Sequence, residues 1–124
     1  MKEVLLIIIA YLIGSIPTAL IISKSFFDVD IREYGSGNMG ATNTFRVLGS
    51  KFGTIVLVGD MLKVILAVAL YNLLPYYVTN ELDCTNLMIG FALSAVLGHI
   101  YSIWAHLRGA KGLASLFVMF RAIQ

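Results

Sequence analysis

The chain has 124 residues, of which 59% are hydrophobic and only 13% are charged, and its mean hydropathy is +0.88. Soluble domains keep roughly a quarter of their residues charged, and so short a chain could not bury this much apolar surface, which excludes a water-soluble domain. The net charge of +2 gives no bulk electrostatic basis for binding nucleic acid, so any basic function must be local.

Three apolar stretches are predicted to form membrane-spanning helices, at residues 4–23, 52–75 and 87–105. A helix of about 20 residues crosses a hydrocarbon core of about 30 Å. Pro17 lies inside the first stretch, and a membrane helix tolerates proline when neighbouring groups satisfy the freed carbonyl. A fourth apolar stretch, 113–123, is too short to span. The sequence thus predicts an all-α integral membrane protein, a single domain with three transmembrane helices and the start of a fourth.

The basic residues of the connections predict how the helices are oriented. Four Lys or Arg residues follow the first helix and two follow the third, whereas the connection between the second and third helices has none. Because Lys and Arg are retained on the cytoplasmic side, we expect both basic connections in the cytoplasm and the N-terminus outside.

The first of these connections concentrates residues suited to binding an anion. Its glycines permit positive φ angles, so that consecutive backbone N–H groups can converge on one ligand, and Arg46 can clamp a phosphate bidentately. Thr42 or Asn43 can begin a short helix whose N-terminus favours negative charge. A flexible surface turn is an equally good interpretation of this loop taken alone. The candidate ligands in this glycine-rich loop (residues 35–46) are Ser36, Gly37, Asn38, Gly40, Thr42, Asn43 and Arg46.

The connection after the third helix contains a second basic loop, residues 108–112. A lysine lies there between glycines at the entry to an apolar stretch, which suits a phosphate cradle although the spacing differs from that of a Walker loop. The same residues also serve as a positive-inside anchor. Because the charge count places both loops on one side, together they predict a shared phosphate site. The candidates here are Arg108, Gly109, Lys111 and Gly112.

Titratable residues also occur inside the predicted helices. Asp60 and Lys63 lie three residues apart on one helix face, and because charges in lipid are costly we expect them to pair; lining a substrate groove is the alternative. His99, near the end of the third helix, is more typical of a hydrogen-bonded structural residue than of a catalytic base.

Taken together, these segments resemble the bacterial acyl-phosphate:glycerol-3-phosphate acyltransferases, small multi-helix enzymes of phospholipid synthesis. The resemblance covers nearly the whole chain and rests on residues 14–17, 36–46, 60–63 and 98–112, of which the stretch 36–43 is the most specific. It implies transfer of a fatty acyl group from acyl phosphate to the 1-hydroxyl of glycerol 3-phosphate, giving lysophosphatidic acid and inorganic phosphate. It also implies a bacterial inner-membrane location.

The resemblance further implies roles for particular residues. Ser36 is similar to a serine important for catalysis, Arg46 to a phosphate ligand, and Lys111 with its flanking glycines to a second, phosphate-binding motif that includes His99. Lys63, in the second predicted helix, and the remaining candidates of the glycine-rich loop are expected to bind substrate. We expect no metal or cofactor, because acyl phosphate is already activated and the enzyme has mainly to position the hydroxyl and stabilise developing charge.

The sequence also departs from the family pattern. Met39 stands where proline is common, Ala110 replaces a usual glycine, and Val64 stands at another usual glycine. The family fold is a seven-helix bundle whose third motif, with an asparagine and a histidine, has no counterpart here. We therefore expect this chain to correspond to the N-terminal part of such an enzyme and to need the remaining part for activity. The alternative is a non-catalytic anion-binding membrane module or transporter subunit, in which Asp60 and Lys63 line a pathway.

Overall fold

The computed structural model describes residues 1–74, 81–105 and 120–121, and every regular element within them is helical. The elements in chain order are α1 (Lys2–Gly14), α2 (Thr18–Phe27), η1 (Ile31–Glu33), α3 (Ala41–Leu48), α4 (Ser50–Ala69), η2 (Leu70–Leu73), α5 (Glu81–Ile100) and η3 (Ile103–Ala105). Three helical stretches are long and apolar enough to cross a membrane, at Lys2–Phe27, Ser50–Leu73 and Glu81–Ile100. The expected all-α membrane fold with three spanning helices is confirmed, while the stretch 113–123 lies largely outside the described residues.

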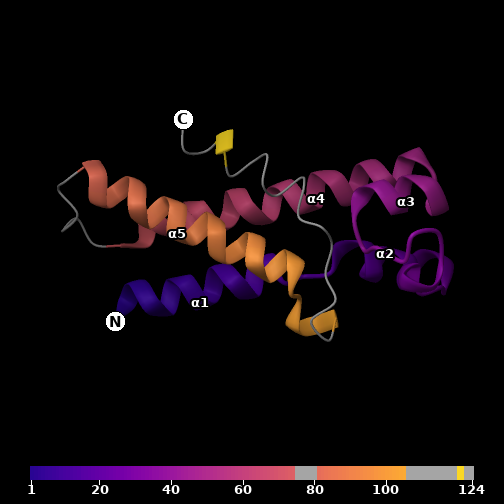
Figure 1. Cartoon of the computed structure of the whole chain (residues 1–124), viewed down its shortest axis with the longest axis horizontal. Helices are drawn as coiled ribbons and strands as arrows, with labels where there is room; N and C mark the ends of the chain where they lie inside the picture. The colour runs from indigo at the N-terminus through magenta and orange to yellow at the C-terminus, as the bar shows by residue number, and fades with distance from the viewer. Residues whose placement is uncertain (75–80, 106–119, 122–124) are drawn as a thin grey trace.

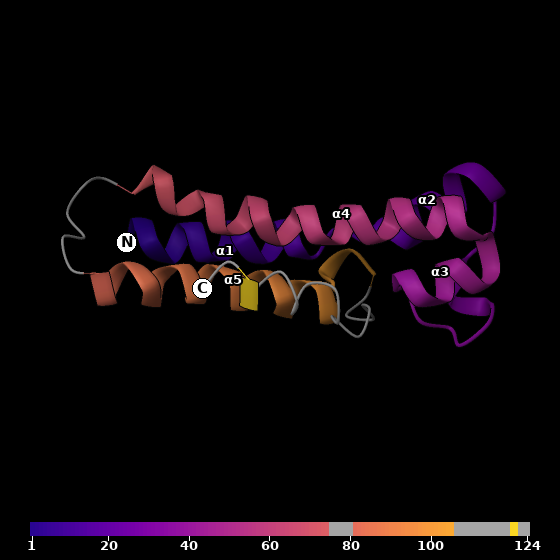
Figure 2. The ribbon, with the colours of Figure 1, turned by 90° about the horizontal axis from the view of Figure 1, so that it is seen from above.

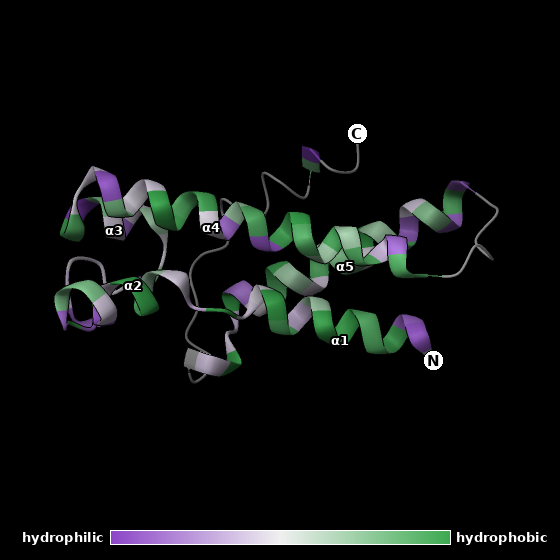
Figure 3. Ribbon diagram, turned by 180° about the vertical axis from the view of Figure 1, so that it is seen from behind, coloured by the Kyte–Doolittle hydropathy of each residue, from purple (hydrophilic) through white to green (hydrophobic). Residues whose placement is uncertain are grey.

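Helices α1, α4 and α5 lie side by side (Figures 1 and 2). The N-terminus, η2 and the start of α5 lie at one end of this bundle, and α2, η1 and α3 lie at the other (Figure 1). Apolar residues run along most of the three long helices, whereas polar residues occur at their ends, on α3 and in the middle of α4 (Figure 3). This distribution suits helices whose outer faces contact lipid.

Two separate apolar clusters form the interior. The first lies between α1, α4 and α5, and its fully buried members include Ala10, Val64 and Phe91. The second joins α2, η1 and the glycine-rich loop to the first half of α4, with Ile31 and Val56 fully buried. Ser15, Asp60 and Lys63 each lie in the sequence between a residue of the first cluster and a residue of the second.

The first spanning stretch is divided, whereas a single helix over 4–23 was expected. Helix α1 ends at Gly14 and α2 begins at Thr18, because Pro17 has no N–H to donate and its ring clashes with the carbonyl one turn earlier. Two local backbone hydrogen bonds flank the break. Ser15 N donates to Tyr11 O at 2.9 Å before it, and Thr18 N donates to Ile16 O at 3.0 Å after it. The two halves together remain long enough to span a membrane.

The other long helices also differ from the expected ranges. Helix α4 begins at Ser50, directly after Gly49, whose φ of +89° separates it from α3. Helix α5 begins at Glu81, six residues before the expected 87. Acidic residues in its first turn lower the local hydropathy but favour a helix N-terminus through the helix dipole.

Close backbone contact holds α5 against α1. A Cβ at Gly14 would clash with the carbonyl of Ala95, and one at Gly98 would clash with the carbonyl of Tyr11. Ser94 Oγ donates to Ile7 O at 2.8 Å across the same interface. This contact places the C-terminal end of α5 beside the break in the first spanning stretch.

Candidate functional site

The glycine-rich loop is organised around the side chain of Asn43, which is only 2% exposed. Its Oδ1 accepts a hydrogen bond from Ser36 N at 3.0 Å, and its Nδ2 donates to Tyr34 O and Asn38 O, both at 3.0 Å. One side chain therefore fixes three points of the loop backbone. These contacts favour an ordered loop over the flexible turn that remained possible from the sequence.

Positive φ angles let the loop backbone wrap around this asparagine. Gly35 has a φ of +56° and Gly37 a φ of +73°, values that residues with a Cβ rarely adopt. A Cβ at Gly35 would also overlap Asn43 Oδ1. The glycines are thus needed to fold the loop around the buried amide, whatever ligand the loop binds.

Helix α3 begins where the loop ends. A short helix starting at Thr42 or Asn43 was suggested by the sequence, and the observed helix starts at Ala41 after the N-cap Gly40, with no side-chain cap. Thr42 and Arg46 are both exposed and lie four residues apart, so they share one face of α3. Ser36 is also exposed, and its Oγ accepts a long hydrogen bond of 3.4 Å from Asn38 N.

The charged residues of α4 form a buried cluster with α5. Lys63 Nζ lies 2.7 Å from Asp60 Oδ1 and 3.4 Å from His99 Nδ1, and all three side chains are less than 10% exposed. The Lys63–Asp60 contact is a close ion pair rather than a well-directed hydrogen bond, because within the described residues Asp60 Oδ1 has no aligned donor. The expected pairing of Asp60 and Lys63 is therefore observed.

Lys63 of this cluster and Ser102, from the segment after α5, donate hydrogen bonds to the carbonyls that the break exposes. Lys63 Nζ donates to Ile16 O at 2.6 Å, and Ser102 Oγ donates to Ser15 O. Ser15 Oγ in turn donates to Tyr11 O at 2.8 Å. The proline break is thus stabilised by side chains from α4 and from the segment after α5, as a spanning helix requires.

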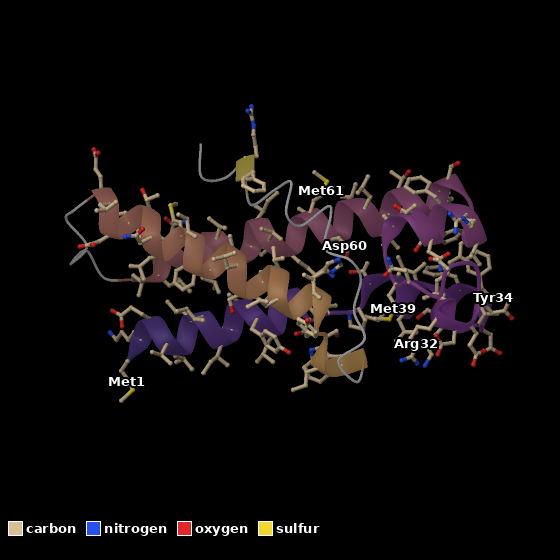
Figure 4. All side chains as sticks on the ribbon, viewed as in Figure 1. Met1, Arg32, Tyr34, Met39, Asp60 and Met61 are labelled. Carbon is tan, nitrogen blue, oxygen red and sulfur yellow. The ribbon has the colours of Figure 1, made fainter. Side chains whose placement is uncertain are left out.

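A small pocket, partly open to the exterior, lies at this break. Its walls are residues 15–18, Lys63, His99, Ser102 and, from the glycine-rich loop, Met39. Figure 4 shows Met39 lying between Asp60 and the end of the molecule that carries Tyr34. The loop and the buried cluster therefore meet at Met39, which is 5% exposed.

The structure brings together only some of the candidate residues. Lys63 and His99 share the pocket, whereas Ser36, Thr42 and Arg46 lie exposed on the loop and α3. Within the described ranges, no hydrogen bond or ion pair joins these three side chains to the buried cluster. Arg108, Gly109, Lys111 and Gly112 lie outside the described residues, so the shared site for two loops stays a prediction.

Sequence reasoning did not single out the two serines of the pocket as site residues. Ser15 and Ser102 are fully buried, and the hydroxyl of Ser102 donates a hydrogen bond to the backbone carbonyl of Ser15. The available signal was Pro17, because a proline inside a spanning stretch frees carbonyls that must find donors nearby.

A second ion pair lies outside the spanning helices, in η1. Arg32 Nη2 lies 2.6 Å from Asp30 Oδ2, and Asp30 Oδ1 accepts from Arg32 N at 3.0 Å. The hydrogen bonds from Arg32 lower the pKa of Asp30 to about 2. Arg32 is therefore engaged within its own turn, which leaves Arg46 as the more available cation of this region.

Comparison with known proteins gives consistent matches over this architecture. The family model described as glycerol-3-phosphate acyltransferase matches residues 4–124. A glycerol-3-phosphate acyltransferase of Bacillus subtilis (strain 168) is 50% identical over 111 residues, which is 90% of this chain and 52% of the relative. One of Lactiplantibacillus plantarum is 50% identical over 115 residues, 93% of this chain and 52% of the relative. The chain spans about half the length of the curated relatives it matches.

Two solved structures are similar across the whole chain. The crystal structure of PlsY, an integral membrane glycerol 3-phosphate acyltransferase, in its glycerol 3-phosphate form has a TM-score of 0.83 and 34% identity, with 100% of this chain and 58% of that chain covered. The lysophosphatidic acid form has a TM-score of 0.79 and 31% identity over the same coverage. The helix arrangement described above is therefore shared with an integral membrane protein.

Proposed function

This chain belongs to the glycerol-3-phosphate acyltransferase family, and we propose that it forms the N-terminal, loop-bearing part of an enzyme that makes lysophosphatidic acid. The acyl donor is acyl phosphate and the acceptor is glycerol 3-phosphate. The two solved structures of the relative are its glycerol 3-phosphate form and its lysophosphatidic acid form, which supports the acceptor and the product. No metal or cofactor enters the proposed reaction.

The observation that carries this proposal is the glycine-rich loop, pre-organised by Asn43 and edged by exposed donors. Ser36 and Arg46 offer a hydroxyl and a guanidinium to phosphoryl oxygens, and the uncapped start of α3 adds backbone N–H groups. In our proposal Asn43 shapes the loop rather than contacting the ligand, because Oδ1 and Nδ2 of its amide are already bonded to the loop. Gly37, Asn38, Gly40 and Thr42 present the backbone and side-chain donors around it.

The chemistry needs positioning and charge stabilisation more than proton activation. The 1-hydroxyl oxygen attacks the acyl carbonyl carbon, an ester bond forms, and the bond from that carbon to the phosphate oxygen breaks. In the overall balance the hydroxyl proton leaves with inorganic phosphate. Preorganised donors in a site partly shielded from water stabilise the negative charge that develops on the carbonyl oxygen and on the departing phosphate. In this proposal Ser36 and Arg46 act there, and the acyl tail stays in the bilayer.

The remaining candidates complete the proposed site. Residues 108–112 form the second phosphate-binding loop, with Lys111 as its cation between Gly109 and Gly112, and with Arg108 beside it. We place both loops in the cytoplasm of a bacterial cell and the N-terminus outside the inner membrane, in accord with the distribution of Lys and Arg. His99, which precedes the second loop in the sequence, lines the pocket at the proline break.

A chimera tests this proposal directly. Residues 1–124 replace the matching segment of the B. subtilis relative, and membranes are supplied with acyl phosphate and labelled glycerol 3-phosphate. We expect labelled lysophosphatidic acid, and a loss of at least about 100-fold in the Ser36→Ala chimera, the scale of losing one catalytic group. A chimera that is inserted in the membrane at normal levels but makes no product would overturn the proposal.

A further inference from the structure

Lys63 Nζ is surrounded by groups of this chain. It lies 2.6 Å from Ile16 O, 2.7 Å from Asp60 Oδ1 and 3.4 Å from His99 Nδ1. An ammonium group has three hydrogens and no acceptor. The ammonium donates to the Ile16 carbonyl, pairs with the Asp60 carboxylate and has His99 Nδ1 within hydrogen-bond distance, and the side chain is 5% exposed.

This arrangement determines which nitrogen of His99 carries the proton. A carbonyl oxygen and a carboxylate oxygen accept hydrogen bonds, and an ammonium can only donate. If His99 Nδ1 also carried a hydrogen, two donors would face each other across 3.4 Å. Nδ1 must therefore accept, and the ring proton must lie on Nε2.

The surroundings of His99 agree with this assignment. Among the described residues, the titratable groups that face the ring are Asp60 and Lys63 from α4, and Asp60 Oδ1 is 3.9 Å from Nδ1, beyond hydrogen-bonding distance. The break contributes Ser15, and the segment after α5 contributes Ser102, whose hydroxyls both donate to backbone carbonyls. Within the part of the chain that the structure describes, no hydrogen bond uses His99 Nε2, and the residue lines the pocket.

We propose that Lys63 is a positioning residue that holds His99 as the neutral Nε2–H tautomer and so presents a hydrogen-bond donor to the pocket. The acceptor is an oxygen of the substrate's phosphate, and only this identification of the acceptor rests on the proposed function. Lys63 thus acts on the ligand through His99, because its buried ammonium is already in contact with Ile16 O, Asp60 Oδ1 and His99 Nδ1. A neutral donor suits this position, because a second cation beside Lys63 would be repelled.

Nitrogen NMR tests the tautomer without any assay of activity. The chain is labelled with ¹⁵N-histidine in lipid nanodiscs, and a His106→Gln variant removes the other histidine signal. Long-range proton–nitrogen correlations at neutral pH should show Nε2 protonated and Nδ1 unprotonated in His99. A spectrum with Nδ1 protonated, or with both nitrogens protonated, would overturn the proposal, and this measurement needs no change to Lys63.

A variant then tests the part played by the ammonium. In Lys63→Met the two well-separated ring-nitrogen resonances of His99 should move toward averaged positions, whereas Lys24→Met, a change at an exposed lysine of α2, should leave them in place. Unchanged His99 resonances in folded Lys63→Met would show that the lysine does not set the tautomer. Failure of the proposed acyltransferase would instead leave the tautomer intact and abolish only product formation by the chimera.

Discussion

Replacing Asn43 with alanine tests whether one buried amide holds the glycine-rich loop together. The change removes three hydrogen bonds of 3.0 Å, from Ser36 N and to the carbonyls of Tyr34 and Asn38. At about 1 kcal/mol for each net bond, the loop loses roughly 3 kcal/mol of local stability. That loss corresponds to about a 100-fold increase in the open fraction of the loop.

Hydrogen exchange measures this opening at a single group. The Ser36 amide should lose about 100-fold of its protection in Asn43→Ala, while amides in the middle of α4 keep theirs. Thr42→Ala, an exposed neighbour in the same helix, should leave the Ser36 amide unchanged. Unaltered protection of Ser36 in Asn43→Ala would refute the reasoning, because the loop would then be held by something other than this side chain.

Three further changes have defined outcomes. Gly98→Ala should destabilise the protein by roughly 2–4 kcal/mol in detergent unfolding, because its Cβ meets the α1 backbone, whereas Gly90→Ala, with open space around it, should be neutral or slightly stabilising. Asp30 has a folded pKa of about 2 against an ordinary 3.8, so its ion pair with Arg32 stabilises the fold above about pH 4 and is lost as pH falls toward 2. Asp30→Asn should therefore cost roughly 1 kcal/mol at neutral pH after solvent screening, and little at about pH 2; an equal cost at both would contradict the assignment. Arg46→Lys in the chimera should raise KM for glycerol 3-phosphate about tenfold through loss of bidentate contact, and an unchanged KM would remove Arg46 from the phosphate site.

The spanning helices could be predicted because lipid imposes a simple requirement of length and apolarity on each of them. Their details depended on competing local effects. The acidic residues that begin α5 reduce hydropathy while favouring the helix start, so the helix was expected to begin later than it does. Pro17 indicated freed carbonyls, and the donors that satisfy them come from Lys63 and Ser102, far along the chain.

The candidate site was predictable in residue type more than in arrangement. Asn43 was recognised as a polar group of the glycine-rich loop, and its burial depends on the backbone wrapping that Gly35 and Gly37 permit. The pairing of Asp60 with Lys63 followed from their spacing on one helix. The proximity of His99 to that pair did not, because it depends on how α5 packs against α4 and α1.

The most direct test of the account is the compartment that each loop faces. In a Cys84→Ala background, single cysteines at Ser36 and at Ala110 would be labelled with a membrane-impermeant thiol reagent in intact cells and in inverted vesicles, with Asp83→Cys as the control on the opposite side. We predict that both loop positions react only in inverted vesicles and that position 83 reacts in intact cells. If positions 36 and 110 react from opposite sides of the membrane, the two loops cannot share a phosphate site and the account is contradicted.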